Sequence, residues 1–368
     1  MSQAPDPPFA ARVDALQSDL DGETLVAYSG PNTNYLAGFF GEPLDRHLLV
    51  LVGPTGNPRV VAPEKCRHVV ADSWLDGPAA VPDNDPGAVA RAAADLVETE
   101  TVLVDDRAPF GVTGPLDAAT EASVEPAGAL LATHRLRKDD SEVARLRESA
   151  TVADAVSRDV RALGAGAVGR TEADLAAEVR SRLHAAGGTR LSFDVVVASG
   201  PHAAEPYRRS SDRRIRAGEP VILDFGAFVG GYASDQTRTV VFEGEPPEGF
   251  EEAHEAVVAA VEAGVEAVEP GVSAGAVDRA TEAVVRERGY GDGLVHATGH
   301  GVGLDAHEAP TIADGNEREL EPGMVFSIEP GVYVEGEFGV RIEDLVVVTD
   351  EGCERLNDSP KTWQPLEE

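Results

Sequence analysis

The segment VILDFGAFVGGYASDQTRTVVF, residues 221–242, holds two strand-like patterns on either side of the glycine pair Gly230-Gly231. Adjacent glycines favour a tight turn, so the segment is predicted to form a hairpin. If the turn is centred between Val229 and Gly230, Asp224 and Asp235 lie directly opposite each other, where cross-strand Cβ atoms are about 5 Å apart. The hairpin is therefore predicted to bring two carboxylates to one point.

The segment MVFSIEPGVYVEGEFGVRIEDLVVVT, residues 324–349, repeats this arrangement around Gly336. Glu329 and Glu343 are each seven residues from that glycine and form a second facing pair. In so acidic a chain any single Asp or Glu is better explained as a solvated strand residue, but two symmetric pairs are not. Because facing anions repel, and burial increases the cost, the four carboxylates predict a bound cation.

Between the two hairpins, the segment HATGHGVGLDAHEAP, residues 296–310, places His300 among Gly299, Gly301 and Gly303. Glycines permit backbone geometries that other residues resist, and His300 is the natural nitrogen ligand. A site rich in oxygen ligands suits manganese, and one added imidazole admits cobalt, iron or zinc. Two adjacent ions would share a water, lower its pKa and polarise a carbonyl oxygen, which predicts hydrolysis.

A chain of 368 residues is long enough for two domains with separate cores. Up to about residue 132 strand patterns alternate with helical ones, as in an α/β domain. A charged run then leads into a long amphipathic helix that Ser141 can cap, so the predicted domains are 1–134 and 135–368. In the second domain a unit of helix, capped turn, helix, strand and hairpin occurs twice, with Thr171 and Ser273 as the caps, which indicates duplication.

The formal charge of −34 comes from 65 acidic and 31 basic residues, with lysine only at Lys65, Lys138 and Lys361. Such a surface repels nucleic acid. Self-repulsion on this scale is tolerated where molar salt screens charges over about 3 Å, so the composition predicts a halophilic protein of a salt-rich cytoplasm. An ordinary acidic bacterial protein is the alternative.

No apolar run approaches the roughly 20 residues that span a bilayer, so membrane insertion is not expected. The N-terminal sequence MSQAPDPPFA has neither the basic stretch nor the apolar core of a leader peptide, which favours the cytoplasm. Cys66 and Cys353 lack the close spacing of zinc or disulfide frameworks and are predicted to be free thiols.

These motifs resemble those of the pita-bread metallopeptidases, the M24 family of methionine aminopeptidases, Xaa-Pro aminopeptidases, prolidases and creatinase. The matching segments are LDFGAFVGGYASDQTRT (223–239), TGHGVGLDAHEAP (298–310), SIEPGVYV (327–334), GVRIEDLVVVT (339–349) and, in the N-terminal half, NTNYLAGF (32–39). The resemblance implies an α/β N-terminal domain of the creatinase and prolidase kind, followed by an α+β pita-bread catalytic domain. It also implies a homodimer.

By this resemblance Asp224 would bind one ion, His300 and Glu329 the other, and Asp235 and Glu343 both. All five ligands are present, although some relatives that have lost them work without metal. His307 falls where the family has a histidine that contacts the substrate carbonyl and the tetrahedral intermediate. Arg341 resembles an arginine that prolidase-type members place near the site; pairing with surface acids is its alternative role.

One segment departs from the family pattern. Members usually have SGPNxxxPH before the first hairpin, whereas this chain has SGPHAAEPYRRSSDR, residues 199–213, with Tyr207 in place of the second histidine. In peptidases that histidine is thought to interact with the scissile amide or the leaving nitrogen. Tyr207 could still donate a hydrogen bond there, and His202 could take over the role if the loop bends back, although a structural role fits His202 better.

The leading interpretation is a hydrolase with two divalent ions that cleaves Xaa-Pro bonds of dipeptides or short peptides, as an Xaa-Pro aminopeptidase or dipeptidase. Glu329 would assist proton transfer. A second interpretation keeps the metals but replaces the peptide with a small amide or osmolyte, and Tyr207 is the feature that favours it. The third is a non-catalytic binding protein, against which the five intact ligands argue.

Overall fold

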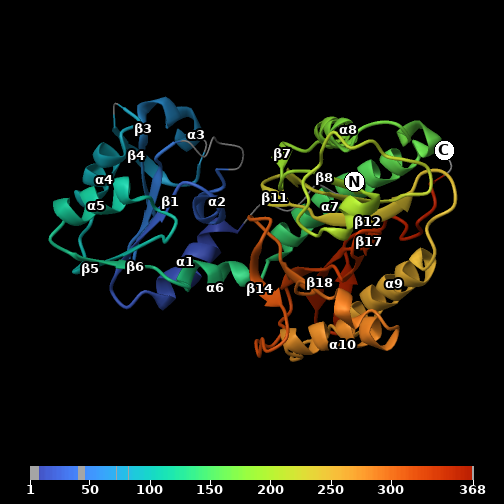
Figure 1. Ribbon diagram of the computed structural model, residues 1–368. Coiled ribbons are helices and arrows are strands. Elements are labelled where there is room, and N and C mark those ends of the chain that lie inside the picture. Colours follow the sequence, from blue (N-terminus) through green and yellow to red (C-terminus); the bar gives the residue numbers. More distant parts are fainter. Residues whose placement is uncertain (1–7, 40–45, 72, 82, 367–368) are drawn as a thin grey trace. The chain divides into compact units, whose positions relative to one another are not determined.

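The computed structural model describes residues 8–39, 46–71, 73–81 and 83–366 (Figure 1). The chain divides into two compact units, of which the first ends at Arg135 and the second begins at Leu136. Within the described part of the chain, no helix has both the length and the apolar character needed to cross a membrane. Cys66 and Cys353 are free thiols, as predicted.

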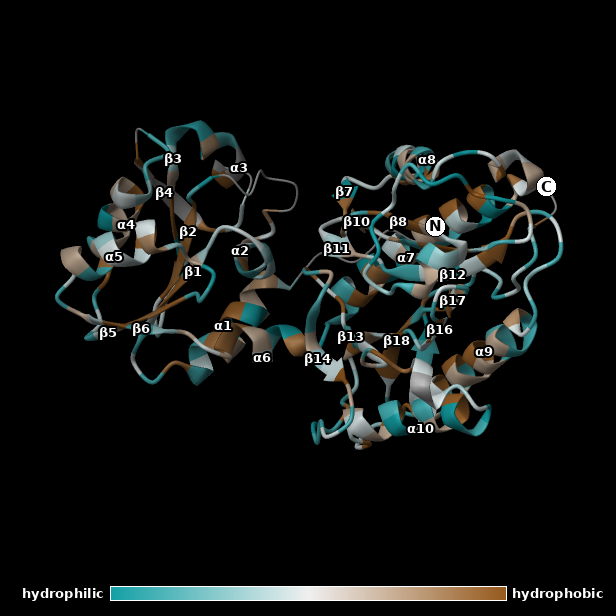
Figure 2. Ribbon diagram, viewed as in Figure 1, coloured by the Kyte–Doolittle hydropathy of each residue, from teal (hydrophilic) through white to brown (hydrophobic). Residues whose placement is uncertain are grey.

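The N-terminal unit is a six-stranded sheet in the order β4-β3-β2-β1-β5-β6. The β1–β2 and β2–β3 pairs are antiparallel and the others parallel. The elements are β1 (Thr24–Tyr28), β2 (Leu49–Val52), β3 (Arg59–Pro63), β4 (Asp76–Val81), β5 (Thr101–Val104), β6 (Ser123–Pro126), α1 (Phe9–Asp19), α2 (Pro31–Ala37), α3 (Arg67–Ala71), α4 (Pro86–Ala94), α5 (Phe110–Ala119) and α6 (Leu130–Leu136). This is the predicted α/β pattern. Strand β2 is hydrophobic along its length and β1 through its centre (Figure 2), because their residues face layers on both sides.

The second unit begins with the long helix α7 (Asp140–Arg161), whose predicted cap is wrong. Asp139, not Ser141, caps α7, since its carboxylate accepts hydrogen bonds from the amides of Ser141 and Glu142. The side chain of Glu142 returns a bond to the Asp139 amide and completes a capping box. Ser141 cannot form such a box, because the residue three positions later is Ala144.

The remaining elements form two halves that repeat one arrangement. The first half contains α8 (Glu172–Ala185), β7 (Arg190–Leu191), β8 (Val196–Ser199), β9 (Pro220–Phe225), β10 (Ala227–Val229), β11 (Tyr232–Ala233) and β12 (Gln236–Val241). The second contains α9 (Phe250–Glu266), α10 (Ala274–Glu287), β13 (Gly299–Gly301), β14 (Glu308–Ile312), β15 (Val325–Ile328), β16 (Gly331–Val334), β17 (Phe338–Arg341), β18 (Asp344–Thr349) and β19 (Gly352–Arg355). Their main sheets run β12-β9-β8 and β14-β13-β15-β18-β19, and each half has its own apolar core.

The two helix starts that the sequence pairs are equivalent in the structure. Thr171 precedes α8 and bridges to Arg214, and Ser273 precedes α10 and bridges to Glu319 in the same antiparallel sense. The two starts differ in the cap itself. The Thr171 hydroxyl accepts a hydrogen bond from the Asp174 amide, whereas the Ser273 side chain makes no capping bond. The predicted duplication is therefore visible in the hydrogen bonding.

Buried charged side chains hold the C-terminal segment against the rest of the second unit. The Arg161 side chain on α7 is fully buried and donates to the carbonyl oxygens of Pro360, Thr362 and Gln364. Asp344, also fully buried, lies 2.7 Å from Lys361 Nζ through its Oδ2 atom. Because α7 packs in the apolar core of the first half and Asp344 belongs to the second, this segment ties the two halves together.

His254 gives the fold a predicted pH dependence. It lies on α9 at 4% exposure with its ring 5.9 Å from that of Phe250, and burial lowers its pKa to about 4. A lowered folded-state pKa means that the stabilising contribution is complete above pH 6.5 and is lost as the pH falls toward 4. We expect His254→Gln to remove about 3 kcal/mol of this pH dependence, measured by urea unfolding at pH 7 and at pH 4.5. Equal pH slopes for the two proteins would contradict the assignment.

Candidate metal centre

The first hairpin brings its two aspartates together by a different route from the predicted one. Val229 pairs with Tyr232, so the turn is centred on Gly230-Gly231, and Asp224 lies opposite Thr237 rather than Asp235. The predicted register is wrong because both glycines have positive φ, +56° and +89°, as a two-residue hairpin turn requires.

Asp235 instead falls in the break between β11 and β12. On the facing strand a Cβ at Gly226 would come within 1.8 Å of the Ser234 carbonyl oxygen, so only glycine allows this close approach. The irregularity returns Asp235 to the neighbourhood of Asp224, and one carboxylate oxygen from each lies within 4.8 Å of the other and of Glu343. The convergence arises from the break in the ladder, not from direct cross-strand pairing.

The second hairpin has the predicted centre. Val334 pairs with Phe338 around Gly336, and the outer ladder continues the same register, with Ile328 opposite Asp344. Glu329 and Glu343 lie at the junction of these two ladders. Glu343 is anchored from β12, because its amide donates to the Thr237 carbonyl and its Oε2 atom accepts a bond of 2.9 Å from the Thr237 hydroxyl.

His300 points one ring nitrogen at the carboxylates. Its Nδ1 atom lies 3.2 Å from the Gly301 carbonyl oxygen and donates to it, so Nε2 is the ring nitrogen that faces the carboxylates. Nε2 lies 3.2 Å from Glu329 Oε1 and 3.7 Å from Asp235 Oδ2. The flanking glycines serve close approach rather than unusual φ, since a Cβ at Gly299 would lie 1.9 Å from a backbone oxygen of β15.

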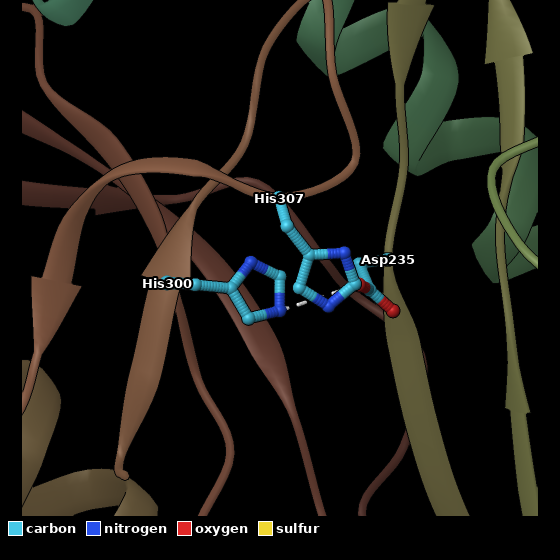
Figure 3. A group of neighbouring side chains, drawn as sticks. All are labelled: Asp235, His300 and His307. Atoms are coloured by element: carbon cyan, nitrogen blue, oxygen red, sulfur yellow. Dashed lines mark ion pairs between the residues drawn. The ribbon is translucent and has the colours of Figure 1, made fainter.

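The five predicted ligands and His307 fall into three overlapping groups whose donor atoms lie within 4.8 Å of one another. These groups are Asp224, Asp235 and Glu343; His300, Glu329 and Glu343; and Asp235, His300 and His307. Figure 3 shows the third, with a dashed line that joins His300 to Asp235 and the His307 ring beside it. The ring centroids of His300 and His307 are 3.9 Å apart.

Burial and mutual repulsion dominate the electrostatics. Burial, then the charges of neighbouring carboxylates, raise the pKa values of Asp235 and Glu343 well above the ordinary range. Burial also acts to raise the pKa of Glu329, but the hydrogen bond and charge of His300 outweigh it and lower that pKa. Glu343 Oε1 is buried with no hydrogen-bond partner among the described residues. An unpartnered anionic oxygen inside a carboxylate cluster fits a divalent cation as the missing partner.

Arg341 is buried and forms an ion pair with one carboxylate of the cluster. It is 5% exposed, and its Nη2 atom lies 2.5 Å from Asp224 Oδ2, so it pairs inside the site and not with surface acids. Nη1 donates to the Tyr333 hydroxyl at 3.0 Å, and Nε donates to the Thr237 hydroxyl. Tyr333 and Thr237 were not among the predicted site residues. Strand alternation could have indicated them, because residues an even number of positions apart on a strand face the same side. Thr237 is two residues from Asp235, and Tyr333 is eight residues from Arg341.

A cavity of about 620 Å³ adjoins the cluster, and the substrate-facing candidates differ in how they line it. His307 lies in its wall, and the adjacent Glu308 is fixed by the buried Lys138, whose Nζ atom is 2.6 Å from Glu308 Oε1. Tyr207 lines the same cavity, but its side chain is 86% exposed. His202 is not among the lining residues, because its Nδ1 atom is bonded to the buried carboxylate of Glu172.

Carboxylates from two hairpins and one oriented imidazole, arranged around a cavity, are the donor set of a divalent-metal enzyme. The chain also matches the model of metallopeptidase family M24 over residues 144–350, and it belongs to that family. It is a metallopeptidase. The fold class predicted above, an α/β N-terminal domain followed by a pita-bread catalytic domain, is confirmed by solved structures that match along the whole chain.

Three relatives illustrate the similarity. The chain is 36% identical over 350 residues to the probable dipeptidase PepE of Mycobacterium tuberculosis, which covers 91% of this chain and 90% of that one. The structure of an Xaa-Pro dipeptidase from Bacillus anthracis is 30% identical with a TM-score of 0.90, covering 97% of this chain and 100% of the other. That of a prolidase from Thermococcus sibiricus is 32% identical with a TM-score of 0.88, covering 98% and 100%.

Proposed function

We propose that this metallopeptidase cleaves Xaa-Pro bonds of dipeptides or short peptides. The observation that carries the proposal is the convergence of Asp224, Asp235, His300, Glu329 and Glu343 beside one cavity. The printed names of its relatives, Xaa-Pro dipeptidase and prolidase, support the substrate class. A small peptide also suits the cavity, whose volume lies within the range of about 300–1,000 Å³ typical of small-molecule sites.

Two cations would be held by overlapping ligand sets. Asp224 belongs to one set, His300 and Glu329 to the other, and Asp235 and Glu343 are shared, which is consistent with the presence of Glu343 in two of the groups above. Manganese or cobalt is the leading candidate, and iron or zinc is also compatible with carboxylates plus one imidazole. When bound, the ions supply Lewis acidity that polarises a carbonyl oxygen and lowers the pKa of water.

The protein's own groups supply orientation and proton transfer. Glu329 is the proposed proton acceptor, because His300 keeps it ionised and its Oε1 atom accepts a second bond from the Ser327 hydroxyl. His307, in the cavity wall, would donate to the scissile carbonyl oxygen and to the anion that develops on it. Arg341 fixes the orientation of Asp224. Tyr207 would contact the leaving side of the substrate from the rim.

The proposal extends to the setting of the enzyme. The excess of acidic residues and the two free thiols support a halophilic protein in a salt-rich cytoplasm. A homodimer is the assembly that the family resemblance implies. Light scattering in molar salt would test it, and a monomeric mass would overturn this part of the proposal.

We expect the enzyme to hydrolyse an Xaa-Pro dipeptide or an Xaa-Pro-Yaa tripeptide in molar salt with added manganese or cobalt. The release of the N-terminal residue measures both reactions. Cleavage of the dipeptide indicates dipeptidase activity, and cleavage of the tripeptide indicates aminopeptidase activity. Asp235→Asn is the inactive control, because it removes a shared ligand. If the metal-loaded protein cleaves neither peptide, the proposal fails, and small non-peptide amides become the substrates to test.

A further inference from the structure

One arginine at the cavity is positioned by a chain of hydrogen bonds that leads to a buried carboxylate. Arg208 lines the cavity and follows Tyr207, in the loop after β8 where the sequence departs from the family pattern. Its Nη2 atom lies 3.1 Å from His202 Nε2, and its Nη1 atom donates to Glu205 Oε2 at 3.0 Å. Its amide also donates to the Glu205 carbonyl oxygen, which closes a turn. The guanidinium is therefore held from two sides.

The support behind Arg208 is itself fixed. Glu172 is fully buried and receives the amides and hydroxyls of Ser199 and Ser211. His202 Nδ1 lies 3.0 Å from the same carboxylate and must donate to it, so His202 Nε2 carries a lone pair and accepts from Arg208. These partners explain why Glu172 stays ionised, since its pKa is lowered although burial acts to raise it.

The loop is also packed tightly onto strand β17. A Cβ at Gly339 on β17 would come within 1.9 Å of the Ala203 carbonyl oxygen, so the turn of residues 200–204 lies directly against the strand that ends in Arg341. The turn that carries His202, the partner of Arg208, is thus packed against the strand that ends in the metal-site arginine. A loop so restrained keeps the guanidinium in one region of the cavity wall.

The three arginines at the cavity differ in what they can offer a ligand. Arg341 uses all three of its nitrogens on Asp224, Tyr333 and Thr237. The Arg209 side chain is 87% exposed, and its nearest carboxylate, that of Asp194, is 3.8 Å away. A guanidinium has five N–H donors, and the contacts of Arg208 with His202 and Glu205 use two of them. Arg208 alone combines restraint with remaining donors.

We propose that Arg208 binds the free carboxylate of the substrate and so makes this enzyme a dipeptidase. The inference rests on the proposed Xaa-Pro hydrolysis. The carboxylates in the cavity wall, those of Asp194, Asp224 and Glu329, would repel a substrate carboxylate that lay beside them. A dipeptide presents its carboxylate one residue beyond the scissile carbonyl, and the planar fork of a guanidinium matches carboxylate geometry. In a longer peptide an uncharged amide takes that position.

The test compares an Xaa-Pro dipeptide with the same dipeptide amidated at its C-terminus. We expect Arg208→Gln to lower kcat/KM for the dipeptide by about 10- to 150-fold, mainly through KM, since it removes a charge-assisted hydrogen bond. The amide should change by less than about threefold. Arg208→Lys should give an intermediate loss, and Arg209→Gln should change the dipeptide-to-amide ratio by less than about threefold.

An equal loss on both substrates, or an unchanged ratio, would overturn the assignment, because a merely structural role does not distinguish a carboxylate from an amide. Calorimetric binding of the two ligands to the metal-loaded protein separates this inference from the function on which it rests. If the wild type cleaves neither ligand but prefers the carboxylate through Arg208, the peptidase proposal fails and the subsite stands. If it shows no preference in binding, the subsite fails.

Discussion

Asp235→Asn should abolish hydrolysis and at the same time stabilise the metal-free protein. Asp235 is 3% exposed and lies among three other carboxylates, and burial followed by the charges of Glu343 and Asp224 raises its pKa well above the ordinary range. Asparagine keeps the shape and removes the charge. At an effective dielectric constant of 20, relieving one such repulsion contributes about 1–4 kcal/mol. Activity should fall by at least about 100-fold because a shared metal ligand is lost.

The measurement is thermal unfolding with a chelator and then with manganese, beside an activity assay. In the chelated proteins the variant should have the higher midpoint. Manganese should raise the midpoint of the wild type more than that of the variant, because a ligand that binds the native state stabilises it in proportion to its affinity. Asp314→Asn, at an exposed ion pair with Arg279, is the control and should change neither the unfolding midpoint nor the activity. A chelated variant that melts below the chelated wild type would refute the picture of an uncompensated anion cluster.

Asp344→Asn should lower stability by about 3–5 kcal/mol, the typical cost of removing one partner from a buried ion pair. Asp344 is fully buried, and its Oδ1 atom lies 2.8 Å from Nη2 of Arg238, which is 1% exposed. Its Oδ2 atom lies 2.7 Å from Lys361 Nζ and 3.1 Å from Arg355 Nε. The neutral amide would leave three cations around an uncharged side chain, with only the half-exposed Glu262 carboxylate paired to Arg355 and Lys361. For a domain of this size the midpoint should fall by about 6–20 °C.

The salt dependence of the stability loss distinguishes this buried network from surface ion pairs. The loss in Asp344→Asn should persist in both about 0.1 M and about 1 M salt, since buried charges are poorly screened. Glu354→Gln at the half-exposed pair with Arg147 is the comparison, and its smaller effect should shrink as salt is added. A loss in Asp344→Asn that disappears in high salt would show that the network is solvated and would contradict its proposed role in joining the two halves.

The N-terminal α/β pattern, the duplicated unit and the centre of the second hairpin could be predicted because each depends on local spacing. Gly336 is a tight-turn residue at the midpoint of an alternating pattern, so the register of Glu329 and Glu343 follows from counting. The same counting gave the wrong register for Asp224, since Gly230 and Gly231 allow two turn centres and only the folded ladder selects one. The cap of α7 was missed because Asp139, Asp140 and Ser141 are all acceptable capping residues.

The sequence by itself determined the fold class, the family and the chemical identity of the donors, because strand alternation, turn glycines and the grouping of acids with His300 are properties of short segments. Tertiary structure alone decided the rest. The contact of Asp224 with Arg341, the orphaned oxygen of Glu343 and the support of Arg208 by His202 join residues from different elements. Such contacts depend on how the elements pack, and no local pattern encodes the distance between two side chains on separate strands.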